Sequence, residues 1–261
     1  MQIPQVGLGM FKIDDPDMAG VVDVALRAGY RHFDLAAYYG NERAFGHALR
    51  ESGAARDELF LTSKVWNTDH GHTEALAAFE RTRAHLGVDV LDLYLIHWPV
   101  PSAGRYLETW QALEGLQQQG LTRAIGVSNF TRTHLERLLA QSDVKPAVNQ
   151  VELHPYFQQR CLRTFHHEHG IVTQAWSPLG RGAVLDDPVV VEIAARHHVS
   201  PAQAILRWHL QLGTVVFPKS SSPARIAANI DLFGFELDED DMQRMRSLDR
   251  GRRTGPDPDS M

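Results

Sequence analysis

The sequence has few of the features that mark secreted, membrane or nucleic-acid-binding proteins. It contains a single cysteine, Cys161, so an internal disulfide is excluded, which agrees with a reducing, cytoplasmic compartment. The first residues, MQIPQVGLGM, lack the cationic start and apolar core of a signal peptide. No apolar run approaches the roughly 20 residues of a membrane span. A net charge of −6, from 26 basic and 32 acidic residues, gives no basic surface for nucleic acid.

Short apolar segments alternate with helical patterns along the whole chain. Most of the apolar segments have no polar face, which is typical of buried parallel strands. No linker divides them, so we expect residues 1–261 to form one domain, a (β/α)8 TIM barrel with an irregular C-terminal tail over about 249–261. The expected strands are residues 6–10, 32–35, 59–64, 91–97, 123–128, 147–153, 171–176 and 214–217.

The main alternative to the barrel is an open, doubly wound sheet. When that fold binds a dinucleotide, its first strand usually leads into a G-x-G-x-x-G turn. The two G-x-G segments of this chain, which begin at Gly7 and Gly180, both lack the third glycine. The closed barrel is therefore favoured.

Titratable side chains stand where three consecutive strands end. Asp34, Lys64 and His97 follow apolar runs, and Tyr39 comes five residues after Asp34. In a parallel barrel these positions share one mouth. A lysine next to a tyrosine favours the phenolate and lowers the pKa of the phenol, and a phenol tuned in this way suits proton transfer to a forming alkoxide.

Each of these groups also has a plainer interpretation. Tyrosines at strand ends are usually packing residues, and a lone Asp–Lys pair is usually structural. The occurrence at three consecutive strands favours a functional site. The spacing alone does not choose between Tyr39 and its neighbour Tyr38.

A second polar segment, FPKSSSPARIAAN, runs from Phe217 to Asn229. A strand there ends in Lys219, and a helix begins at Pro223 with Arg225 in its first turn. The free N–H groups of a helix start, beside cationic and hydroxyl side chains, suit a phosphate. The alternative is an ordinary serine-capped helix with solvated charges, but barrels commonly hold a phosphate near their last strands.

Other polar or aromatic residues end the strands between these two segments. Ser128, Asn129, Gln150 and Glu152 carry groups that suit a carboxamide or a ribose, and Trp176 offers a flat face for an aromatic ring.

Nine motifs in this order resemble those of the aldo-keto reductases, and the chain is most similar to the bacterial members that include 2,5-diketo-D-gluconate reductases. They are GLGMFK, HFDLAAYYGNE, LFLTSKVW, DLYLIHWP, IGVSNF, NQVELHPY, TQAWSPLG, FPKSSSPARIAAN and LDRGRRTGPDPD, which together cover nearly the whole length of the chain. The family's members are NADPH-dependent (β/α)8 barrels, so the resemblance implies reduction of aldehydes or ketones, including small carbonyls, diketo sugar acids or methylglyoxal.

The resemblance also implies roles for individual residues. Asp34, Tyr39, Lys64 and His97 match the catalytic tetrad, with Tyr39 as the general acid. Ser128, Asn129 and Gln150 match the positions that hold the nicotinamide carboxamide, and Trp176 matches the residue that stacks on its ring. Lys219, Ser220 and Arg225 match the residues that hold the 2′-phosphate, which implies NADPH rather than NADH, and Asn229 matches an adenine contact. The other implied cofactor contacts are Ser177 and Leu179.

The chain departs from the family pattern at several places. Leu35 replaces a usual Thr or Ser, Met10 and Phe11 replace Thr-Trp, and Ala228 replaces a Glu near the adenosine. The N-terminal hairpin that usually closes the bottom of the barrel is missing or truncated. We therefore expect an exposed barrel floor and reduced stability.

Aromatic residues that follow the catalytic strand ends indicate the substrate pocket. We expect Phe11, Trp66 and Trp98, together with His97, to contact the substrate. Several histidines outside this region are interpreted as solvated surface residues: the group 166, 167 and 169, the pair 197 and 198, and the pair 70 and 72. His154 is interpreted as structural.

The sequence thus predicts a cytoplasmic, monomeric enzyme that uses NADPH to reduce a small-molecule carbonyl, without a metal, a membrane or a nucleic acid. Two alternatives remain. One is an NADPH-binding redox sensor or regulatory subunit on the same barrel, with little turnover. The other is a metal-dependent barrel hydrolase or isomerase, which needs more carboxylate and histidine ligands at the mouth than Asp34 and His97 supply.

Overall fold

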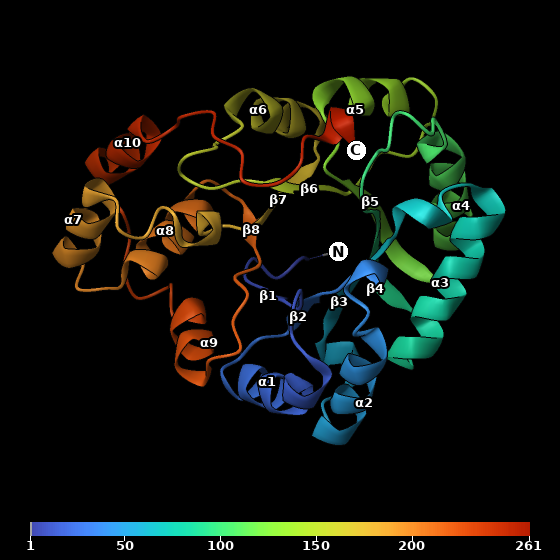
Figure 1. Ribbon diagram of the computed structural model, residues 1–261, viewed down its shortest axis with the longest axis horizontal. Coiled ribbons are helices and arrows are strands. Elements are labelled where there is room, and N and C mark those ends of the chain that lie inside the picture. The colour runs from blue at the N-terminus through green and yellow to red at the C-terminus, as the bar shows by residue number, and fades with distance from the viewer. Residues whose placement is uncertain (1) are drawn as a thin grey trace.

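The computed structural model describes residues 2–261, which form a barrel of eight parallel strands surrounded by helices (Figure 1). Each strand pairs with the next in chain order. The predicted (β/α)8 fold is confirmed, and the doubly wound alternative is wrong. The strands are β1 Leu8–Gly9, β2 His32–Asp34, β3 Phe60–Val65, β4 Leu91–Ile96, β5 Thr122–Ser128, β6 Val148–Glu152, β7 Val172–Trp176 and β8 Val215–Val216.

Helices form the outer ring and begin close to the positions that the sequence indicates. Ser200 Oγ accepts a hydrogen bond from Gln203 N at 3.3 Å and so caps the helix that begins at Pro201. Within residues 2–261 no helix is both long enough and apolar enough to cross a membrane. The bounds are α1 Asp15–Arg27, α2 Glu42–Ser52, α3 His72–Leu86, α4 Tyr106–Gln118, α5 Arg132–Leu139, α6 Arg160–His169, α7 Pro188–Arg196, α8 Pro201–Gln211, α9 Pro223–Ile230 and α10 Glu239–Ser247.

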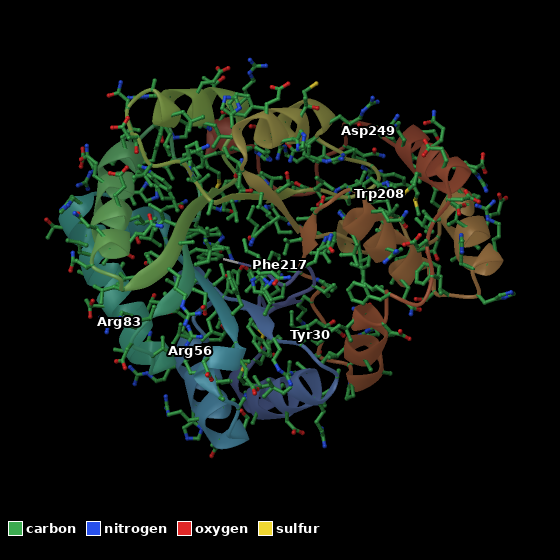
Figure 2. The ribbon with its side chains drawn as sticks, turned by 180° about the vertical axis from the view of Figure 1, so that it is seen from behind. Tyr30, Arg56, Arg83, Trp208, Phe217 and Asp249 are labelled. Carbon is green, nitrogen blue, oxygen red and sulfur yellow. The ribbon has the colours of Figure 1, made fainter. Side chains whose placement is uncertain are left out.

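The ring closes between its first and last strands. Gly7 N donates to Val216 O at 2.9 Å, and Val216 N donates to Gln5 O at 3.0 Å. Position 7 requires glycine, because a Cβ there would lie 2.8 Å from the ring of Phe217, which Figure 2 places near the barrel axis. Closure brings the carboxyl ends of all strands to one mouth.

Both faces of the strands are buried, which explains their continuous apolar runs. In β4, Leu93 and Leu95 belong to a cluster of buried residues that also contains Phe60 and Val148. Tyr94, between them in sequence, faces the other way and packs on Phe79 of α3 with ring centroids 4.9 Å apart. Packing on both sides fixes the direction in which each strand's last side chain points.

The barrel floor is less open than expected. Within residues 2–261 no hairpin precedes β1, and the N-terminal segment enters at the centre of the ring (Figure 1). Ile3 packs against the interior cluster, and Pro4 O lies 3.0 Å from the Nδ1 of His32. The prediction of exposure is wrong for Phe60 and Leu93, which are 6% and 0% exposed and belong to the cluster against which Ile3 packs.

The C-terminal tail crosses the molecule after α10. It begins at Leu248, passes over the barrel and ends beside α5 (Figure 1). The backbone N–H groups of Arg250 and Arg252 both donate to Tyr156 O, at 3.1 Å and 3.0 Å. Near the chain end, Asp259 Oδ1 lies 3.4 Å from His134 Nε2. The sequence predicted an irregular tail here but did not indicate its path.

Candidate active site

Side chains from the ends of β2 and β3 form a buried ion pair at the mouth. Lys64 Nζ donates to the two carboxylate oxygens of Asp34 at 2.8 and 2.9 Å and to Leu35 O at 2.8 Å. It lies 3.4 Å from Tyr39 Oη. Lys64 is 0% and Asp34 4% exposed, so each charge depends on the other for compensation.

Tyr39, rather than Tyr38, lies beside this ion pair. The two tyrosines end a short 3-10 turn, Ala37–Tyr39. Tyr38 is 54% exposed and stacks on Trp66 with centroids 3.9 Å apart. The ring of Tyr39 lies 5.9 Å from that of His97 at nearly a right angle. The structure therefore brings together Asp34, Lys64 and His97 from the ends of three strands and Tyr39 from the turn.

Burial dominates the electrostatics of the four groups. Burial lowers the pKa of His97 well below its ordinary value, and the charge of Lys64 lowers it further, so the imidazole is neutral. Burial also lowers the pKa of Lys64, although Asp34 opposes this shift. The Nδ1 of His97 is buried without a hydrogen-bond partner in the described part of the chain. A neutral imidazole with an uncommitted nitrogen is suited to hydrogen-bonding a ligand.

The sequence predicted that Lys64 lowers the pKa of Tyr39, and this prediction is wrong for this structure. Burial raises the pKa of Tyr39 well above its ordinary value, and the charge of Asp34 raises it further. The carboxylate of Asp34 is paired with the ammonium of Lys64 and opposes its effect on the phenol. The 3.4 Å separation of Nζ and Oη is also longer than a strong hydrogen bond.

Amides at the ends of β5 and β6 form one connected network. Gln150 Nε2 donates to Asp34 Oδ1 at 2.8 Å and to Gln174 Oε1 at 3.1 Å. Asn129, whose φ is +63°, donates to His97 O at 2.9 Å and to Ser128 Oγ at 3.1 Å. The N–H groups of Gln150 are therefore committed to the protein, and its network holds the Asp34 carboxylate in place.

The strand β7 ends in Trp176, beside this network. Its Nε1 donates to Asn129 Oδ1 at 2.7 Å, which fixes the indole plane. Trp98 lies on one side, with centroids 6.5 Å apart. Ser177 and Leu179 follow in the loop, where both are partly exposed and Ser177 has a φ of +48°. The indole is only partly buried, so part of it remains available to a ligand.

The segment after β8 gathers positive charge at the start of α9. Lys219 and Arg225 are exposed. Ser220 is buried, and its Oγ accepts from Ser222 N at 3.1 Å and from Arg225 Nε at 3.3 Å. Ser222 is the N-cap residue of α9 but makes no side-chain cap hydrogen bond, so the alternative of an ordinary serine-capped helix lacks its capping bond. Asn229, one turn further into α9, is 5% exposed.

Comparison with known proteins places this geometry in a family. The model of the aldo/keto reductase family matches residues 5–250. The chain is 51% identical over 256 residues to an aldo-keto reductase of Mycolicibacterium smegmatis, covering 98% of this chain and 93% of that protein. The chain belongs to the aldo/keto reductase family.

Two further comparisons bear on the family's chemistry. The chain is 49% identical over 262 residues to the glyoxal reductase of Bacillus subtilis, covering 100% of this chain and 94% of that protein. A solved structure of a Gox0644 variant in complex with NADPH superimposes with a TM-score of 0.95 at 48% identity, covering 99% of this chain and 94% of that one.

The positions at which this aldo/keto reductase departs from the family pattern differ in their exposure. Met10 and Leu35 are both 0% exposed, so their side chains do not line the mouth. Phe11 is 41% exposed and lies 5.0 Å, centroid to centroid, from Tyr39. Trp66 lies 5.0 Å from His97. Phe11 and Trp66 thus lie on two sides of the Tyr39–His97 pair. Of Met10, Phe11 and Leu35, which all differ from the family pattern, Phe11 is the residue whose side chain lies at the mouth.

Glu152, at the end of β6, has a role that the sequence did not reveal. Its Oε1 accepts from Thr254 N at 2.6 Å and from Thr254 Oγ1 at 2.5 Å, and its Oε2 accepts from Gly255 N at 3.0 Å. A Cβ on Gly255 would lie 2.4 Å from the indole of Trp176. Glu152 therefore anchors the tail directly against Trp176.

Burial by itself would raise the pKa of Glu152. The hydrogen bonds from His154, Thr254 and Gly255 together outweigh burial and hold this pKa at about 2. His154 is 0% exposed, with Nε2 at 3.1 Å from Glu152 Oε1, in keeping with a structural role.

Two histidines that we interpreted as solvated are buried. His166 is 0% exposed and lies 2.9 Å from both Asn149 Nδ2 and Thr173 Oγ1. His70 is 2% exposed. The helical spacing of Leu162, Phe165, His166 and His169 was the signal that could have identified the buried face of α6. Among residues 2–261 no group of three or more His, Cys, Asp or Glu is arranged to hold a metal.

Proposed function

We propose that this chain reduces aldehydes and ketones to alcohols with NADPH, and that Tyr39 delivers the proton. The observation that carries the proposal is the contact of Tyr39 Oη with Lys64 Nζ at 3.4 Å beside His97, at the mouth of a closed barrel. Membership of the aldo/keto reductase family supports the same activity.

Each of the four side chains has a distinct role in this proposal. His97 is neutral and donates a hydrogen bond to the carbonyl oxygen of the substrate. Tyr39 donates its phenolic proton to that oxygen as negative charge develops on it. Asp34 holds the ammonium of Lys64 3.4 Å from Tyr39 Oη, where Nζ is positioned to donate a hydrogen bond to the phenolate as it forms.

The residues that would hold NADPH fit its charge and shape. Lys219 and Arg225 present two exposed cations at the start of α9, where free backbone N–H groups also favour a phosphate. Between this cluster and the tetrad, Ser128, Asn129 and Trp176 offer polar and aromatic groups for the nicotinamide end. When bound, the reduced nicotinamide supplies hydride to the carbonyl carbon.

The substrate class that fits best is a small aldehyde, ketone or dicarbonyl. Phe11, Trp66 and Trp98 give the mouth aromatic walls, and such walls exclude water while the polar pair Tyr39 and His97 orients one oxygen. Similarity to a glyoxal reductase supports α-dicarbonyls such as glyoxal and methylglyoxal. Diketo sugar acids are a second candidate group.

An NADPH-consumption assay over a panel of carbonyls tests the activity. The panel should contain methylglyoxal, a diketone, a keto sugar acid and an aromatic aldehyde. We expect rapid, carbonyl-dependent loss of NADPH with at least one α-dicarbonyl. Tight NADPH binding without turnover on any compound would instead support the alternative, a redox sensor on the same barrel.

We further propose that residues 1–261 work as one cytoplasmic, monomeric domain. The single cysteine supports a reducing compartment, and the four side chains of the proposed tetrad all come from the same chain. Size-exclusion chromatography with light scattering measures the mass directly. A dimer mass at micromolar concentration would contradict the proposed monomer.

A further inference from the structure

A cavity of about 670 Å³ lies outside the barrel ring, between α6, α8 and α10. Small-molecule sites commonly have volumes of about 300–1,000 Å³. None of the residues that line this cavity belongs to the proposed tetrad or to the proposed cofactor site. The proposed reductase activity therefore does not explain it.

Three arginines give the cavity a strong positive charge. Arg160 and Arg163 come from α6, and Arg246 comes from α10. The side chain of Arg163 donates to Gln158 O at 3.4 Å. Within residues 2–261, none of the three guanidinium groups lies within 4.0 Å of a carboxylate. Against them, the cavity lining includes a single carboxylate, that of Glu239.

The arginines repel one another. Burial lowers the pKa of Arg163, and the charges of Arg160 and Arg246 lower it further, while Asp249 opposes the shift. Arginine is the side chain that loses its proton least readily. Burial of the Arg163 charge and its repulsion by two like charges both disfavour the charged form, and a bound anion would offset both effects.

The remaining lining of the cavity is mixed, with polar side chains such as Thr164 and Gln243 beside apolar ones. Leu212 and Met242, which are both partly exposed, supply its apolar side, while Trp208 on the outer helix α8 (Figure 2) lies beneath them and is only 1% exposed. Gln158 Nε2 donates to Pro155 O at 2.9 Å and to Met245 O at 2.8 Å. These bonds tie the end of α10 to the segment before α6, so the walls are fixed before any ligand arrives.

We propose that this cavity is a second ligand site, which binds a small anion that carries an aromatic or similar apolar group. Arg163 and Arg246 hold the carboxylate or phosphate head, and the apolar body lies on the side of Leu212 and Met242. Guanidinium groups bind both kinds of head in a planar, two-pronged geometry. The site is separate from the barrel mouth, so it can be occupied together with NADPH and substrate.

Calorimetric titration of the full chain tests this site without any turnover. The probes are phenyl phosphate, benzoate and inorganic phosphate, each at low and at physiological ionic strength. The test variants are Arg163→Gln, Arg246→Gln and Arg246→Glu. Arg246 is exposed on α10, so its variants keep the fold even where Arg163→Gln is unstable, and circular dichroism checks each of them.

Two matched variants control for binding elsewhere. Arg43→Gln removes an exposed arginine of α2, on another part of the outer ring. Arg225→Gln removes a cation of the proposed cofactor site. A probe that bound at the cofactor site would lose affinity in Arg225→Gln alone.

We expect one-to-one binding of phenyl phosphate or benzoate that weakens at higher salt. Arg163→Gln and Arg246→Gln should each weaken it about tenfold, Arg246→Glu should abolish it, and the two controls should leave it unchanged. Absence of binding to the wild-type chain, or equal affinity in wild type and Arg246→Glu, would overturn the site. Equal affinity for inorganic phosphate and phenyl phosphate would overturn the role of the apolar side.

Discussion

Replacing Glu152 by alanine should release the C-terminal tail from the barrel mouth while leaving the barrel folded. Three hydrogen bonds from Thr254 and Gly255 end on this carboxylate. In the variant, these donors have no acceptor in the protein and turn to water. The tail around Gly255 then loses its contact with Trp176.

The pKa of Glu152 gives the size of the effect. The pKa falls from its ordinary value of 4.5 to about 2, and 4.5 − 2 corresponds to about 3 kcal/mol at about 1.36 kcal/mol per pH unit. His154 supplies part of this, which leaves about 2 kcal/mol for the tail, or roughly a thirtyfold change in its opening equilibrium. Because the pKa is lowered, this stabilisation is complete above pH 4.5 and is lost as the pH falls toward about 2.

Limited trypsin digestion measures the opening, because the tail carries Arg250, Arg252 and Arg253. Cleavage through a briefly opened segment follows the population of the open form. We expect cleavage in the tail of Glu152→Ala to be about thirty times faster than in wild type, with the rest of the chain intact. Thr254→Val, which removes one hydroxyl, should give a smaller increase. Equal cleavage rates in wild type and Glu152→Ala would refute the anchoring role.

Three further predictions concern the mouth itself. Arg225→Ala should weaken NADPH at least tenfold and NADH little; equal losses in a fluorescence titration would remove the assignment to the 2′-phosphate. Lys64→Met leaves the Asp34 carboxylate buried and unpaired, so urea unfolding should show a loss of about 3–5 kcal/mol; a loss below about 1 kcal/mol would contradict the buried pair. His97 should stay neutral between about pH 6 and 8 in NMR spectra, and a titration midpoint in that range would contradict the burial argument.

The place of the residues at the strand ends could be predicted from the sequence, because the geometry of a closed parallel barrel decides where those residues lie. Asp34, Lys64 and His97 each follow an apolar run, and parallel strands of a closed barrel must end at the same mouth. The local spacing did not choose between Tyr38 and Tyr39. The choice came from the resemblance to a family, and the structure places Tyr39 beside Lys64.

Other features depend on contacts that local patterns do not reveal. Glu152 and Thr254 lie 102 positions apart, and neither shows in sequence that it needs the other. His166 was misjudged because a run of histidines looked solvated, although the helix turns this one toward Asn149 and Thr173. The pKa of Tyr39 depends first on its burial and then on the nearby charge of Asp34, and local spacing reveals neither.

The most direct test of the proposed activity is Tyr39→Phe, measured for both NADPH affinity and turnover in the full chain. The substitution removes only the hydroxyl that lies 3.4 Å from Lys64 Nζ, so the fold and the cofactor site should be unchanged. We predict NADPH binding within about twofold of wild type and a fall in carbonyl reduction of at least about 100-fold, the usual share of a general acid. Retention of more than about a tenth of the wild-type rate would contradict the assignment of Tyr39 as proton donor.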